Sequence, residues 1–223
     1  MKKALRAIYC FFVFGVFAFS NANAQKLFVE GELLYAITIS QNDPEQKTSN
    51  NIQGTLSIKQ KGHAVLKELL LKNGFKSTKL FLGQAKPSYS FVLIGEQNFA
   101  LKSDEESLRN TLLKCKELTL EPLPTDIKSI AGFKTERGKI LCNDRKPIVI
   151  HYTQEWQTNN PLLFEEFSSF KALPLAFEIN NEDGSLIRFE LINIESKPME
   201  NVVFQIPSGY KIISQEEYKV WQH

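Results

Sequence analysis

A regular alternation of apolar and polar residues near the start of the chain most limits how it can fold. Across residues 27–40 the odd positions are mostly apolar, and four even positions carry Glu, Thr or Ser; the apolar set is Leu27, Val29, Leu33, Tyr35, Ile37 and Ile39. Successive side chains of a strand point to opposite faces, so this pattern predicts one long strand with a buried face. Such a strand needs neighbours, and the fold must therefore be built around a sheet.

The runs that follow are short and are separated by turn residues. Gly62, Asn73-Gly74, Gly83 and Pro87 divide strands expected at 55–61, 64–72, 79–82 and 89–94. Asn-Gly between two apolar runs favours a tight hairpin, because both residues tolerate positive φ. Further strands are expected at 117–121, 132–141, 148–154, 175–179, 185–194, 202–206 and 210–213. Short strands joined by tight turns indicate an antiparallel meander rather than βαβ units.

Two segments are expected to be helical. Ser103 followed by Glu106 fits the capping box and predicts a helix that ends near residue 116. Asn160 before Pro161 fits the cap and first position of a short helix that ends near Phe170. The remaining tail, up to residue 223, is polar. The predicted fold class is mainly β (α+β), with a few short helices.

The amino-terminal segment has the composition of a cleavable signal peptide. A charged start precedes 13 largely apolar residues at 7–19, and Ala22 and Ala24 fit the small-residue pattern for cleavage between Ala24 and Gln25. A membrane anchor would need about 20 apolar residues. A lipoprotein would need Cys where Gln25 stands. We therefore expect a signal peptide at 1–24 and one domain at 25–223, with no transmembrane span after cleavage.

The charge of the chain argues against nucleic acid and anionic lipid surfaces as partners. Removing Lys2, Lys3 and Arg6 with the signal leaves 24 Lys and Arg against 25 Asp and Glu, a net charge of −1. No dense cluster of basic residues remains in the expected mature chain. Binding to a polyanion usually leaves such a footprint.

Two cysteines, Cys115 and Cys142, remain after the expected cleavage. In an oxidising compartment they could form a disulfide, which would stabilise the fold by about 3.5 kcal/mol through loop closure. Two separate buried thiols are the alternative, since unpaired cysteines pack as small apolar side chains.

No set of residues has the spacing of a catalytic or metal site. The histidines are His63, His151 and His223, and none belongs to a zinc-binding motif. The sequence holds no G-x-S-x-G motif and no glycine-rich phosphate loop. The adjacent acids Glu165 and Glu166 are interpreted as solvated residues at a helix start. We expect no catalytic residue, no metal and no cofactor; a hydrolase would need His151 beside a buried carboxylate.

An aromatic series is the most informative feature of the second half. Phe164, Phe167 and Phe170 recur every three residues and would form one face of a short helix. Such a face usually completes a core. Alternatively, it lines or covers an apolar cavity for a lipid-like ligand.

Six stretches carry a resemblance to one protein family, at 28–31, 54–62, 127–134, 151–155, 172–178 and 204–210. Among them are Ile130-Ala131-Gly132-Phe133-Lys134, Tyr152-Thr153-Gln154-Glu155 and Ile206-Pro207-Ser208-Gly209-Tyr210. Together they resemble a family of exported Gram-negative envelope proteins. Thr135 stands where that family often has Cys, and Ala172 replaces its usual Gly before Leu-Pro.

The resemblance implies a fold and a class of function. That family is similar in fold to the periplasmic carriers of outer-membrane lipoproteins (LolA/LolB-like), which have a curved antiparallel sheet or half β-barrel covered by a few helices over an apolar cavity. Because of Thr135, a disulfide would have to join Cys115 to Cys142. The resemblance supplies no catalytic residue.

The function expected from this resemblance is non-enzymatic binding of a lipid or acylated ligand, in the periplasm or otherwise outside the inner membrane of a Gram-negative bacterium. The expected ligand-binding residues are Phe164, Phe167 and Phe170 as a covering wall, with Leu33, Tyr35, Ile37 and Phe91 on the strands. An interaction module that docks an envelope protein and has no ligand cavity is the alternative, and a hydrolase is the third reading.

Overall fold

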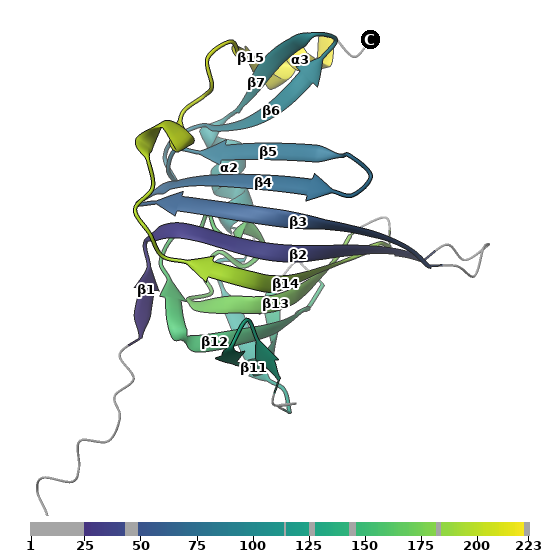
Figure 1. Ribbon diagram of the computed structural model, residues 1–223, viewed down its shortest axis with the longest axis vertical. Helices are drawn as coiled ribbons and strands as arrows, with labels where there is room; N and C mark the ends of the chain where they lie inside the picture. The colour runs from purple at the N-terminus through teal and green to yellow at the C-terminus, as the bar shows by residue number, and fades with distance from the viewer. Residues whose placement is uncertain are drawn as a thin grey trace, which may run out of the picture.

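A single curved sheet of 13 strands organises the chain (Figure 1). The computed structural model describes residues 25–42, 49–113, 115–124, 128–142, 146–181 and 184–220. The expected signal peptide at 1–24 lies outside these residues, so cleavage before Gln25 stays a prediction. The strand order is β15-β7-β6-β5-β4-β3-β2-β14-β13-β12-β11-β8, with β1 beside β12.

The strands of this sheet have the following bounds: β1 (Lys26–Phe28), β2 (Glu30–Asn42), β3 (Ser49–Lys61), β4 (Ala64–Leu71), β5 (Lys76–Phe81), β6 (Ser88–Ile94), β7 (Gln97–Ser103), β8 (Leu118–Pro122), β11 (Glu136–Cys142), β12 (Ile148–Thr158), β13 (Ala172–Asn180), β14 (Leu186–Glu195) and β15 (Lys211–Ser214). A separate hairpin pairs β9 (Ser129–Ile130) with β10 (Phe133–Lys134).

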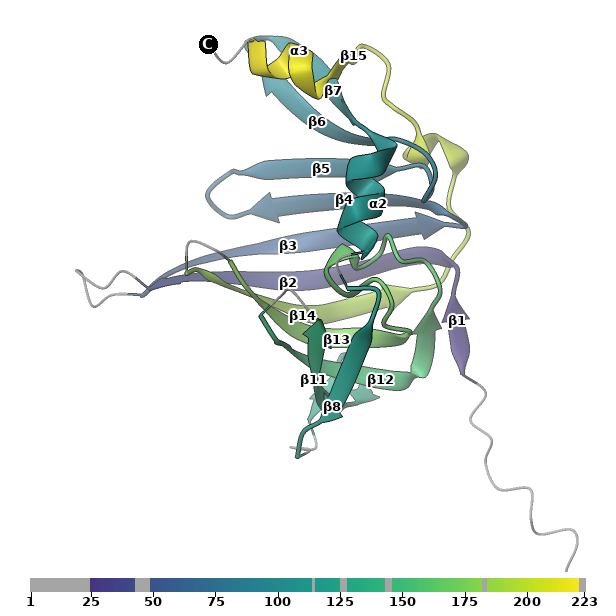
Figure 2. The same cartoon turned by 180° about the vertical axis from the view of Figure 1, so that it is seen from behind.

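The predicted meander is confirmed for β2 to β7, which pair in chain order and antiparallel. The Asn73-Gly74 turn joins β4 to β5, with Gly74 at φ 89°. The second half of the sheet grows from the other side of β2, because β14 returns to pair with it. Two parallel pairs, β1 with β12 and β15 with β7, were not expected. The sheet curls without closing, as Figures 1 and 2 show.

The alternation at 27–40 gives two strands rather than one, with a break at Val29. Gly31 has φ 136°, and a Cβ there would lie 2.0 Å from the carbonyl oxygen of Glu195. Only glycine allows β2 to pass so close to the end of β14. Because of this break, β1 does not continue in the direction of β2 and instead pairs with β12, where Lys26 lies opposite Trp156.

The helices differ from the predictions in several places. The amino end of α2 (Glu105–Leu113) is capped by Asp104 and not by Ser103, since the Ser107 N–H donates to Asp104 Oδ1 at 2.5 Å. A second helix, α3 (Gln215–Val220), occupies the expected polar tail. The strand expected at 202–206 is instead the 3₁₀ turn η2 (Asn201–Phe204), which buries Phe204 against β4 as the chain crosses the sheet.

The helix expected at 161–170 is reduced to the 3₁₀ turn η1 (Glu165–Phe167). In a 3₁₀ turn, side chains three residues apart lie above one another, so a spacing of three suits this conformation better than an α-helix. Asn160 acts at the start of the segment as expected, because its Oδ1 accepts a hydrogen bond from the Leu162 N–H at 3.1 Å.

The main core lies on the concave face of the sheet, where α2 and residues 159–171 cover it (Figure 2). Cross-strand register defines this face: Leu33 is level with Ile58, Ile58 with Lys67, and Lys67 with Lys79. A smaller cluster on the convex face packs Met199 and Phe204 against β4 to β7. A disulfide joins Cys115, just after α2, to Cys142 at the end of β11, with Cα atoms 5.1 Å apart.

Candidate functional site

An apolar pocket of about 280 Å³ lies on the concave face, between the sheet and residues 163–166. Eleven of its fifteen lining residues are apolar, and they come mainly from β2, β3, β13 and β14. They include Ile37, Ile39, Leu56, Phe177, Ile187 and Phe189. A volume near 300 Å³ is at the lower end for small-molecule sites, so the pocket suits one short chain or ring.

Strand register brings these walls together. Ile39 on β2 is level with Ile187 on β14, and Ile37 is level with Phe189. Phe189 is in turn level with Phe177 on β13, and their rings stack with centroids 4.5 Å apart. Because directly opposite residues share one face, the alternating pattern of each strand contributes to a single apolar surface.

The covering segment is tied to the fold at both ends. The Asn160 side chain donates to the carbonyl oxygen of Gly62 at 3.2 Å, and Ser168 Oγ donates to the carbonyl oxygen of Leu112 at 2.9 Å. Between these ties, the Phe164 ring stacks on Phe167 at 5.4 Å. These contacts hold the segment over the concave face.

Three charged side chains meet at the pocket. Glu165 Oε1 accepts a hydrogen bond from Lys67 Nζ at 3.2 Å, and Oε2 accepts one from Lys79 Nζ at 3.1 Å. The Glu165 side chain is only 12% exposed. Burial by itself would raise the pKa of Glu165, but the two ammonium groups outweigh it and hold the pKa below its ordinary value. Glu165 is therefore ionised at neutral pH.

The sequence interpretation of Glu165 as a solvated acid was wrong. Its partners lie 98 and 86 residues earlier in the chain, on β4 and β5. The alternation of side chains along these strands suggests that Lys67 and Lys79 lie on one face of the sheet. No pattern in the sequence around Glu165 shows that it packs over that face. No signal in a single sequence could have found this cluster.

The expected ligand-binding residues divide into three groups. Ile37 and Phe164 line the pocket. Phe167 and Phe170 are buried beyond it in the core, as are Leu33 and Tyr35. Phe91 lies on the convex face, where its ring is 5.0 Å from that of Tyr210. The reason is register: Ser90 is level with Lys79 on the concave face, so the next residue points the other way.

The convex face has a larger hollow, of about 700 Å³, under residues 202–210. Its walls mix apolar side chains with the Lys59–Glu68 ion pair, whose atoms are 2.6 Å apart. Six of its thirteen lining residues are polar or charged, against four of fifteen in the concave pocket. An apolar ligand bound there would therefore bury less of its surface against apolar side chains than in the smaller concave pocket.

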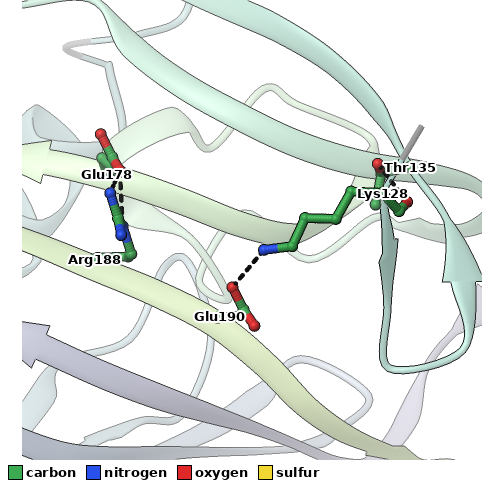
Figure 3. Close-up of polar contacts among 5 residues, drawn as sticks. All are labelled: Lys128, Thr135, Glu178, Arg188 and Glu190. Carbon is green, nitrogen blue, oxygen red and sulfur yellow. Dashed lines mark hydrogen bonds and ion pairs between the residues drawn. The ribbon is translucent and has the colours of Figure 1, made fainter. Parts of the chain in front are cut away.

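A charged surface on β13 and β14 lies elsewhere on the convex face, since its residues are one step in register from Phe177 and Phe189 on the concave face. Figure 3 shows its two ion pairs. Arg188 pairs with Glu178 at 2.5 Å, and Lys128 pairs with Glu190 at 3.0 Å. The Thr135 hydroxyl donates to the Lys128 carbonyl oxygen at 2.8 Å and fixes the start of β9. Both ion pairs are largely exposed, so they contribute little to stability.

His151 borders the same surface but lacks a catalytic partner among the described residues. Its Nδ1 is buried without a hydrogen bond. Burial, and then the nearby Arg137 and Lys128, lower the pKa of His151 more than Glu178 and Glu190 raise it. The imidazole is therefore neutral at neutral pH. Across the described chain, no group of three or more His, Cys, Asp or Glu could hold a metal ion.

No protein-family model and no curated protein matches the chain. Solved structures similar to it include a conserved protein from Thermus thermophilus, with TM-score 0.44, 7% identity, and 86% of this chain and 93% of that chain covered. The Pseudomonas aeruginosa MucA/MucB complex has a TM-score of 0.39 and 13% identity, with 82% of this chain and 58% of that chain covered. A LolA superfamily protein from Nitrosomonas europaea has a TM-score of 0.36 and 8% identity, with 83% of this chain and 94% of that chain covered.

A LolA superfamily protein is thus among the structures that the chain is similar to. At TM-scores below 0.5, none of these likenesses says what the chain binds. In the part of the chain that is described, no helix has the length and hydropathy needed to cross a bilayer.

Proposed function

We propose that this chain is an exported, non-enzymatic protein that holds an apolar or acylated ligand in its concave pocket. The observation that carries the proposal is the apolar lining of that pocket, eleven residues of fifteen. Burying an apolar chain there would gain about 0.8 kcal/mol for each methylene removed from water. The proposal includes no metal and no cofactor.

Two features support export to the periplasm or beyond. The first 24 residues have the pattern of a signal peptide, cleaved after Ala24. Cys115 and Cys142 are paired, and such bonds persist mainly in oxidising compartments. We therefore propose a mature domain that starts at Gln25.

Native mass spectrometry of protein from its own envelope fraction, followed by lipid extraction, tests the proposal. An acyl species should accompany the wild-type chain and be lost from Ile39→Gln/Ile187→Gln, which makes both sides of one cross-strand pair polar. Ile192→Gln is the matched control, since Ile192 also lies on β14, is 50% exposed and does not line the pocket. Ligand-free wild-type protein that also binds no acyl probe would refute ligand binding.

An interaction module is the second candidate, because apolar residues are exposed near the β4–β5 and β6–β7 turns. Leu70, Phe75 and Leu93 are each more than half exposed. Leu70 and Leu93 lie on the convex face, on opposite sides of β5. If the chain binds no acyl probe, and Leu70→Ser/Leu93→Ser abolishes co-purification of one defined envelope protein, this candidate replaces the first.

A further inference from the structure

We infer that the ligand of the concave pocket carries an anionic head group, a carboxylate or a phosphate, which Lys67 and Lys79 bind. This inference rests on the proposed function, since it concerns the polar end of the same pocket. It identifies the class of ligand as an anionic amphiphile rather than a neutral lipid.

The placement of the two lysines is the first reason. Lys67 on β4 and Lys79 on β5 are directly level across the sheet, on its concave face. Like charges in directly opposite positions repel and destabilise a strand pair. Glu165 bridges the two ammonium groups with a single carboxylate, which offsets only part of this repulsion. A ligand that brings negative charge would remove this cost.

The balance of charge in the cluster is the second reason. Glu165 offers one negative charge to two ammonium groups, and each of its oxygens takes one hydrogen bond. Each ammonium has three N–H donors, so donors remain after Glu165 is satisfied. The Lys67 side chain is only 16% exposed, which limits how much water can serve them. Poorly hydrated positive charge favours an additional anion.

The position of the lysines relative to the apolar walls is the third reason. Both ammonium groups lie over the ring of Phe81, a buried core residue outside the pocket lining, with Nζ 5.4 Å from its centroid for Lys67 and 4.7 Å for Lys79. Both side chains also line the pocket, together with residues such as Leu69. A ligand could therefore place its chain against the strands and its head group against the ammonium groups. A pocket with apolar walls and two ammonium groups beside Glu165 and Glu166 can take an anionic amphiphile whose head group replaces Glu165 at those ammonium groups.

Glu165 then has a defined role as an internal competitor. It occupies the ammonium groups while the pocket is empty, and an incoming head group takes over one or both of its hydrogen bonds. Glu166 also lines the pocket, so its charge is tested separately. Neutralising Glu165 should strengthen binding of anionic ligands, whereas neutralising a lysine should weaken it.

Isothermal titration calorimetry with decanoate, decyl phosphate and decan-1-ol tests the inference on the mature chain. Wild type should bind at least one anionic probe about tenfold more tightly than the alcohol, since a charge-assisted hydrogen bond is worth that much. Lys79→Gln should reduce that affinity to the level of the alcohol. Glu165→Gln should raise it, with binding of decan-1-ol unchanged. The tighter of the two anionic probes identifies the head group.

Controls separate head-group binding from general effects on the fold. Lys59→Gln is the matched control: Lys59 also forms an ion pair with a glutamate, but on the convex face, so binding of all three probes should stay unchanged. Glu166→Gln should leave the preference for anionic probes intact. Lys79 is 37% exposed, so its variant should fold even where Lys67→Gln does not.

The outcomes distinguish the two proposals. Equal binding of all three probes, unaffected by Lys79→Gln, would overturn the head-group inference and leave the apolar pocket standing. Stronger anionic binding from Glu166→Gln but not from Glu165→Gln would also overturn it. Binding of none of the probes would refute the proposed function and, with it, the inference.

Discussion

The disulfide should contribute a large share of the stability, and its removal is the clearest test of how the fold is held together. Cys115 and Cys142 are 27 residues apart in the chain and both are buried. Closing a loop of that length lowers the entropy of the unfolded chain, which corresponds to about 3.5 kcal/mol at 25 °C. We expect Cys115→Ala/Cys142→Ala to lose an amount of this size.

The melting temperature converts this free energy into a measurable shift. For a domain of 150–250 residues, each kcal/mol corresponds to roughly 2–4 °C, so the double variant should melt about 7–14 °C below wild type. Differential scanning calorimetry without reductant measures the shift. Adding reductant should lower the wild-type melting temperature toward that of the double variant and leave the variant itself unchanged.

Two results would refute this reasoning. One is a titration of the purified, exported chain that finds two free thiols. The other is a double variant that melts within about 2 °C of wild type when the wild-type thiols are oxidised. The second result would mean that the unfolded chain is already compact around this loop, so that the bond removes little entropy.

Three further predictions concern hydrogen bonds and one ion cluster. Tyr35→Phe removes the buried hydroxyl that donates to the Pro174 carbonyl oxygen at 2.8 Å, and should cost about 1–2 kcal/mol in denaturant unfolding. Asp104→Ala should cost about 1 kcal/mol by removing the cap of α2, while Ser103→Ala should cost measurably less. Because the pKa of folded Glu165 is lowered from its ordinary 4.5, its stabilising contribution is present at neutral pH. That contribution is lost as the pH falls below 4.5 through the lowered pKa. The difference in free energy of unfolding between wild type and Glu165→Gln should therefore become smaller in that pH range.

Local patterns in the sequence were enough to predict most strands. The alternation over 27–40, the Gly62 turn and the Asn73-Gly74 turn define the first hairpins, because these features act within a few residues. The same holds for the cap region before α2, where only the cap residue was wrong, since Asp104 and not Ser103 accepts the hydrogen bond. In each case the energy that decides the structure is set by neighbours in the chain.

Pairings between distant segments could not be predicted in the same way. β14 lies about 150 residues after β2, yet the two pair over most of their length. Any apolar strand with the right alternation would satisfy the same local rule, so the choice among partners is made by the whole sheet. The misplacement of Phe91 has the same origin, since one step in register moves a side chain to the opposite face.

The aromatic series shows how core and site share one segment. Phe170 packs edge-on against Tyr152 with ring centroids 5.4 Å apart, and Phe167 packs against Phe177 at 5.2 Å. Lifting these two rings would expose the core, so the whole segment cannot act as a hinged lid. Phe164 is also buried, but it borders the pocket together with Glu165, so a bound ligand would contact this end of the segment. Ligand binding should therefore change amide hydrogen exchange at 163–166 and leave 168–171 protected. Equal changes over both stretches would show that the core opens as well.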